Sequence, residues 1–123
     1  MRKDHKLANK RYIQAEDLIG QALFCSDQSW ANEIPSWEGE NFSRLHLEGS
    51  FRLSFNGSMF AAEGLGILLS FKNLINCSKE SDLTFIPLSP KCETKLYLIW
   101  NKYQTFTPIA NKFLEQVSLS FKK

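Results

Sequence analysis

Apolar positions along the chain follow two patterns, one typical of strands and one typical of helices. Residues 45–51 alternate between apolar and polar side chains, which predicts a half-exposed strand. Apolar runs of strand length are found at residues 22–25, 67–69, 83–88 and 95–100. The run at 95–100 is rich in β-favouring side chains and almost continuously apolar, so it predicts a central strand.

Helical spacing is clearest at the end of the sequence, where Thr107 offers an N-cap hydroxyl and Pro108 suits the first helical position. One predicted face carries a stripe of large apolar side chains, formed by Ile109, Phe113, Leu114, Val117 and Phe121. Weaker helical patterns cover residues 12–20, which end at Gly20, and 30–42. Pro35 in the second of these either lies in the first turn of the main helix or kinks it.

Residues 56–71 predict a helix that leads directly into a buried strand. Ser58 is the predicted N-cap, with Asn56 and Gly57 forming the bend before it. Gly64 is the predicted stop of the helix, and Gly66 lets the chain turn closely into the strand at 67–69.

Short strands that alternate with short helices predict an α/β domain with a mixed sheet flanked by helices. Ligands in such sheets bind beyond the carboxyl ends of strands, where helices begin. Two segments meet this condition, and they give the candidate ligand-binding residues: Ser26, Asp27, Gln28 and Ser29 in the first, and Asn56, Gly57 and Ser58 in the second. The alternative is that these serines only cap helices.

Composition narrows the function classes. A net charge of +2 is too small to indicate nucleic-acid or membrane binding by itself. The three cysteines form no CxxC pair, and His5 and His46 lack metal-ligand spacing, so neither a metal nor another cofactor is expected. Cys25 with His46 would be a thiol nucleophile and its base, but a buried structural cysteine is the simpler interpretation. We therefore expect a protein that is not an enzyme.

The N-terminal segment is basic and lacks the apolar stretch of a signal peptide, which together with the reduced cysteines predicts a cytoplasmic protein. No apolar run reaches the roughly 20 residues that span a bilayer, so no membrane partner is expected.

Five motifs occur in a familiar order: HKLANK, EDLIGQALF, EGLGILL, FIPLSP and LYLIW…TPIANKFLEQV. In this order they resemble the C-terminal half of the effector-binding domain of LysR-type transcriptional regulators. The resemblance implies a single domain over residues 1–123, forming one lobe of a periplasmic-binding-protein-like (type 2) fold. Residues 94–121 would be the returning strand and helix, while the DNA-binding domain and the first lobe would be absent. Lys6 and Ser70 each stand where the family often has proline.

The resemblance also implies a function. The two candidate segments would line one wall of an effector cleft, and the ligand would be a small anionic or polar metabolite that controls transcription in the intact regulator. DNA would be a partner only through the missing domain. Because the last helix would lack its usual packing partner, we expect its stripe to mediate homo-oligomerisation, as in a homodimer, or to fold back onto the sheet. The alternatives are a solute-binding protein fragment that serves transport and a dimerisation or protein-interaction module.

Overall fold

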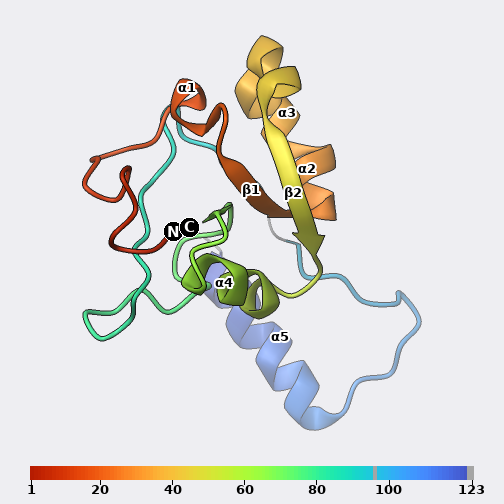
Figure 1. Ribbon diagram of the computed structural model, residues 1–123. Coiled ribbons are helices and arrows are strands. Elements are labelled where there is room, and N and C mark those ends of the chain that lie inside the picture. Colours follow the sequence, from red (N-terminus) through yellow and green to blue (C-terminus); the bar gives the residue numbers. More distant parts are fainter. Residues whose placement is uncertain (96, 122–123) are drawn as a thin grey trace.

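A computed structural model describes residues 1–95 and 97–121 and shows an α/β fold around a small three-stranded sheet (Figure 1). The strands are β1 (Ala22–Ser26), β2 (His46–Phe51) and β3 (Ile67–Leu68), in the order β2-β1-β3. Both pairings are parallel, so the predicted mixed sheet was wrong in this respect. As a result, all three strands end at the same edge of the sheet.

The central strand β1 has the most buried positions, because a neighbour covers it on each side. Parallel strands need crossover connections, and short helices provide them here. Helices α2 (Asp27–Ala31) and α3 (Glu33–Glu38) with the 3-10 helix η1 (Gly39–Arg44) connect β1 to β2. Helix α4 (Ser54–Ala62) connects β2 to β3 and contacts all three strands. The predicted strands at 22–25, 45–51 and 67–69 are thus confirmed.

The largest fully buried side chains of the described residues are those of Ile13, Leu18, Leu23 and Cys25. Leu18 ends the single-turn helix α1 (Ala15–Leu18), which lies within the predicted helical segment 12–20. Most of this core is apolar and lies beside β1. The sheet is therefore anchored through its central strand, and the loops that follow the strands start from fixed positions.

The N-terminal segment runs beside residues 83–88. Thr84 donates its backbone N–H to the Met1 carbonyl at 2.9 Å, and Ile13 donates to the Pro87 carbonyl at 2.9 Å. The two segments meet at isolated bridges at Leu83 and Leu88, so the continuous strand expected at 83–88 is absent from the described structure. Pro87 has no N–H to donate, which limits how far a ladder can extend here.

Two glycines perform the roles that the sequence predicts. Gly64 has φ +74° and ends α4, in the left-handed region that glycine adopts without penalty. Gly66 brings the chain close to β1, since a Cβ built on it would lie 2.3 Å from the Ala22 carbonyl oxygen. This contact allows β3 to pair with the central strand.

The predicted start of α4 was wrong. The helix begins at Ser54, and Ser58 lies in its interior, where its Oγ donates to the Phe55 carbonyl at 2.6 Å. Gly57 is also inside the helix and packs closely against the Phe51 ring: a Cβ there would be 2.6 Å from a ring carbon. The packing of Phe51 thus favours a helix that starts four residues before the predicted cap.

The strand expected at 95–100 is also not observed. Lys95 and residues 97–100 are exposed and form no strand, while Leu96 lies outside the described residues. Backbone pairing stabilises a strand only where a neighbouring edge is available, and this segment lies in the loop that leads to the last helix. The returning strand implied by the family resemblance is therefore not seen in the described part of residues 94–107.

Helix α5 (Pro108–Phe121) confirms the predicted C-terminal helix, and Thr107 Oγ1 accepts from the Ala110 N–H at 3.4 Å. The helix follows a long loop, and this loop is drawn light blue in Figure 1. None of its described residues is buried: Ile109, Phe113 and Phe121 are exposed, whereas Leu114 and Val117 are half-buried. The stripe has thus not folded back onto the sheet.

Candidate ligand-binding pocket

A cavity of about 80 Å³ lies at the carboxyl edge of the sheet, and we call it the carboxyl-edge pocket. Segments that follow all three strands line it. Ser26 and Ser29 come from the end of β1 and from α2, while Phe51 and Ser54 come from the end of β2 and the start of α4. Ser70 follows β3. The parallel topology therefore gathers four hydroxyl side chains around one small space.

The opposite wall of the pocket comes from α3 and from the segment 92–94. Thr94 Oγ1 donates to Glu33 Oε1 at 3.0 Å, which joins these two elements. The other carboxylate oxygen, Glu33 Oε2, is buried and has no hydrogen-bond partner among the described residues. The same holds for Ser70 Oγ. Buried polar atoms without partners are rare and are often explained by a bound ligand or water.

Local structure fixes the polar side chains at the ends of the strands. Ser26 is the N-cap of α2, where its Oγ accepts from the Ser29 N–H at 3.2 Å. Leu69 donates its N–H to the Phe24 carbonyl at 2.8 Å, which holds the residue before Ser70 against the central strand. The pocket is thus built on hydrogen-bonded backbone rather than on a free loop.

The first predicted binding segment is only partly at this pocket. Ser26 and Ser29 line it, as the rule about carboxyl ends predicts. Asp27 and Gln28 are exposed and are not among its lining residues. The two serines are one helical turn apart and therefore lie on the same face. Asp27 and Gln28, which stand between them, lie on other faces.

The second predicted binding segment lies elsewhere. Asn56 is exposed, whereas Gly57 and Ser58 are buried, and none of the three lines the carboxyl-edge pocket. Ser58 was expected at the start of the helix, beside the ligand. The helix instead begins at Ser54, so Ser54 is the serine at the helix start that lines the pocket.

Sequence reasoning missed Ser54, Ser70 and Glu33. Ser70 comes directly after the predicted strand 67–69, so the carboxyl-end rule, applied to this strand as well, would have found it. Ser54 depended on the correct start of α4. Glu33 carries no local signal, because it reaches the pocket through the path of α2 and α3.

An open groove of about 460 Å³ adjoins the pocket, and we call it the outer groove. It shares Glu33, Cys92 and Glu93 with the carboxyl-edge pocket and adds Trp37 and Lys91. Lys91 forms an ion pair with Glu93. A ligand with its head group in the pocket therefore has room for a longer body in the groove.

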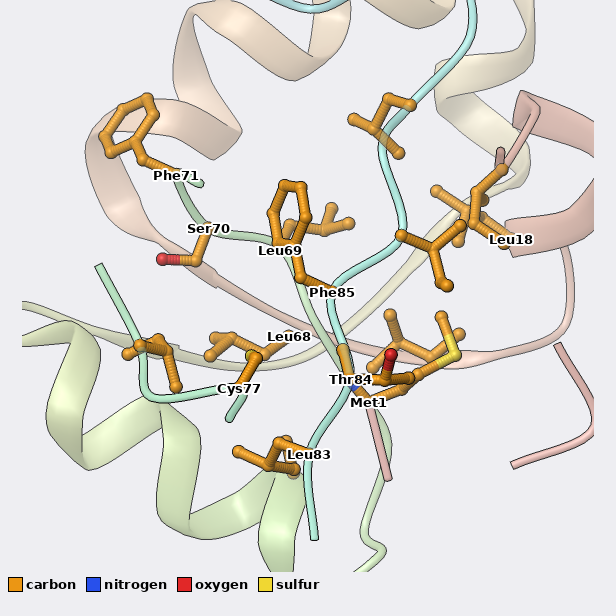
Figure 2. Close-up of a pocket in the computed structure, with 16 residues that line it drawn as sticks. Met1, Leu18, Leu68, Leu69, Ser70, Phe71, Cys77, Leu83, Thr84 and Phe85 are labelled. Atoms are coloured by element: carbon orange, nitrogen blue, oxygen red, sulfur yellow. The ribbon is translucent and has the colours of Figure 1, made fainter. Parts of the chain in front are cut away.

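A second cavity of about 80 Å³ is also lined by the segment that leaves β3 (Figure 2). Its walls are mostly apolar and include Met1, Leu18, Leu83 and Phe85. Ser70 borders this cavity as well as the carboxyl-edge pocket. With few polar groups to orient a ligand, the apolar cavity is the weaker candidate for a specific site.

The pair of Cys25 and His46 does not form a nucleophile and base. His46 pairs with Ala22 at the amino end of β1, three residues before Cys25, or about 10 Å along the strand. Burial raises the pKa of the Cys25 thiol to about 12. His46 Nε2 instead lies 3.0 Å from Glu48 Oε2. Cys25 is thus a structural core residue.

Cys92 is the second thiol of the pocket. Burial, followed by the negative charges of Glu33 and Glu38, raises its pKa, so the thiol is less reactive than a free cysteine.

The described residues contain no group of three or more His, Cys, Asp or Glu side chains able to hold a metal ion. Among residues 1–95 and 97–121, no helix has the length and apolar character that crossing a membrane requires.

The chain was compared with protein-family models, with curated proteins and with solved structures, and none of them matches it.

Proposed function

We propose that the chain is a ligand-sensing unit, the second lobe of a LysR-type effector-binding domain, and that it binds a small polar metabolite in the carboxyl-edge pocket. The observation that carries this proposal is the meeting of Ser26, Ser54 and Ser70, which follow three different parallel strands, at one cavity. Crevices beyond the carboxyl ends of strands are the usual ligand sites of open α/β sheets.

Two further observations support ligand binding. Glu33 Oε2 and Ser70 Oγ are buried at the pocket without a hydrogen-bond partner among the described residues, so a ligand's polar groups would satisfy them. The order of the motifs supports the regulator family, in which such binding would alter the transcription of target genes through a shift between lobe arrangements.

A thermal-shift screen of polar metabolites tests this proposal. We expect at least one compound to raise the melting temperature of the chain, because binding to the folded state stabilises it by RT ln(1 + [L]/Kd). At a hundredfold excess over Kd, the stabilisation is about 2.7 kcal/mol. Ser29→Leu places a larger apolar side chain on the wall of the pocket and is expected to abolish the shift.

Ser118→Leu is the matched control, since Ser118 is exposed on α5 and does not line the pocket. This variant should keep the ligand-induced shift. If no metabolite stabilises the wild-type chain, or if Ser29→Leu responds as strongly as the wild type, the pocket is not a ligand site.

The dimerisation module is the second candidate function, and the exposed stripe of α5 favours it. Ile109 and Phe121 are 81% and 82% exposed, and Phe113 is 58% exposed. Burying a large apolar side chain stabilises an association by about 1.5–3 kcal/mol. We propose that the stripe packs against a second copy of the chain.

Phe113→Ser is expected to weaken this dimer at least about a hundredfold, because a two-fold interface loses the side chain twice. Sedimentation equilibrium over a range of concentrations measures the change. Glu115→Ser is the control on the opposite face of α5 and should leave the dimer intact. A wild-type chain that stays monomeric at all concentrations would contradict the proposal.

A further inference from the structure

The charges at the carboxyl-edge pocket are all of one sign. Glu33 and Glu93 line it, and no Lys, Arg or His is among its described lining residues. Glu93 is exposed and forms an ion pair with Lys91. Glu33 forms no ion pair with any residue in the described ranges 1–95 and 97–121. The pocket therefore holds one carboxylate without a cationic partner from the described chain.

The two oxygens of this carboxylate have different surroundings. Oε1 accepts from Thr94 Oγ1 at 3.0 Å, which fixes the side chain in place. Oε2 is buried, and no described residue donates to it. A buried charged acceptor left unpaired costs more than a neutral one, and a charged donor satisfies it best.

We infer that the ligand of the carboxyl-edge pocket carries a cationic nitrogen, an ammonium or amidinium group, that pairs with Glu33 Oε2. This inference rests on the proposed function of the pocket and specifies the chemical class of its ligand. It favours the polar alternative of the sequence-based expectation over the anionic one.

The rest of the site fits a cationic nitrogen on a longer body. An ammonium group has three donors, and Ser70 Oγ offers it a second acceptor that has no partner among the described residues. The cavity of about 80 Å³ holds only a few non-hydrogen atoms, about the size of such a head group. The outer groove continues from Glu33 past Trp37, so it can hold the apolar or aromatic part of the ligand.

The start of α4 at Ser54 contributes the opposite sign of charge. A helix N-terminus is equivalent to roughly +0.5 elementary charge, and this effect falls off within the first turn. An ionised carboxylate has a full unit of charge, and the side chain of Glu33 lies on the pocket wall. Its attraction for a cation therefore outweighs the partial charge of the helix.

Three probes of similar shape and different charge test the inference: n-butylamine hydrochloride, n-butanol and sodium butyrate. Each is titrated into the ¹⁵N-labelled 123-residue chain at pH 7 and constant ionic strength, and the backbone amide shifts are followed by NMR. We expect butylamine to move the amides of Ser26, Glu33 and Ser70 and to bind at least about tenfold more tightly than butyrate, the ratio typical of one charge-assisted hydrogen bond.

Glu33→Gln keeps the size of the side chain and removes its charge, so it should lower the affinity for butylamine to that for butanol. Glu40→Gln is the control, because Glu40 is exposed and does not line the pocket. It should change the butylamine affinity less than threefold. The comparison of the three probes on the wild-type chain needs no variant, so it decides the question even if Glu33→Gln fails to fold.

The outcomes separate this inference from the proposed function. If butyrate or butanol binds at the same amides as tightly as butylamine, the cationic ligand is excluded and the pocket remains a ligand site. An equal loss of affinity in Glu33→Gln and Glu40→Gln overturns the role of Glu33. If none of the three probes moves the amides at the pocket, the inference of a cationic head group fails, and the thermal-shift screen alone decides whether the pocket is a ligand site.

Discussion

Replacing Gly66 with alanine is expected to destabilise the chain by about 3 kcal/mol or more, the upper range of overpacking in a close-packed region. The added Cβ would lie 2.3 Å from the Ala22 carbonyl oxygen and 2.9 Å from a carbon of the Phe24 ring. Backbone cannot move aside as a flexible side chain can, so β3 would have to separate from β1. Urea denaturation followed by circular dichroism measures the loss.

The same substitution should also remove the ligand binding that we propose, because Leu69 and Ser70, which follow β3, line the pocket. Gly20→Ala is the matched control: Gly20 has φ +75°, and a Cβ there meets nothing within 4 Å. It should cost only the 1–2 kcal/mol of a non-glycine residue at positive φ. If Gly66→Ala is no less stable than Gly20→Ala, the close approach of β3 to β1 is wrong.

The second large effect is a loss of stability with rising pH that depends on Glu38. Its side chain is buried, with 6% of its surface exposed, and neither carboxyl oxygen has a hydrogen-bond partner among the described residues. Burial, with a smaller contribution from the negative charge of Glu16, raises the pKa of Glu38 from 4.5 to about 7. The folded chain thus holds a proton that the unfolded chain releases at lower pH.

The direction of this pH effect follows from the linkage between proton binding and folding. Between about pH 4.5 and pH 7 the folded state binds more protons than the unfolded state, so the free energy of unfolding falls as the pH rises. The contribution of a neutral Glu38 is complete below about pH 4.5 and is lost above pH 7. Glu38→Gln, which remains neutral, should therefore be more stable than the wild type at pH 8, by roughly 2–3 kcal/mol.

Urea denaturation at pH 5 and pH 8 measures this difference. The gain from Glu38→Gln should fall to about a quarter of its pH 8 value at pH 5, because the wild-type carboxyl is protonated there in the folded chain and still partly protonated in the unfolded chain. Glu40→Gln is the control, since Glu40 is exposed in η1 and should change stability by less than about 0.5 kcal/mol at either pH. Equal effects of Glu38→Gln at the two pH values would show that Glu38 is not a buried, protonated group.

Local sequence patterns were enough to predict the three strands and the last helix. Residues 22–25 and 67–69 are short apolar runs, and Gly66 marks the close approach between them. Thr107 and Pro108 begin α5 as expected. In each case the signal lies within a few residues, so no knowledge of distant contacts was needed.

The errors arose where distant contacts decide the structure. The start of α4 depends on how the Phe51 ring packs over Gly57, and no local cap signal reports this contact. The run at 95–100 has the side chains of a strand, but the described residues 95 and 97–100 pair with no neighbour. Strand propensity describes a fit to a sheet surface, and it does not supply the sheet.

The pocket could be predicted only in part for the same reason. Ser26 and Ser29 follow a strand that the sequence reveals, so the carboxyl-end rule reaches them. Glu33, Ser54 and Ser70 join them because three parallel strands end at one edge of the sheet. The expected mixed sheet would not have brought these segments together.

The most direct test of the central claim is a crystal structure of the chain with the metabolite that stabilises it most in the thermal-shift screen. We predict ligand density at the carboxyl edge of the sheet, in contact with Ser26, Ser54 and Ser70. Density in the apolar cavity beside Met1, or against α5, with the carboxyl-edge pocket empty, would contradict the claim.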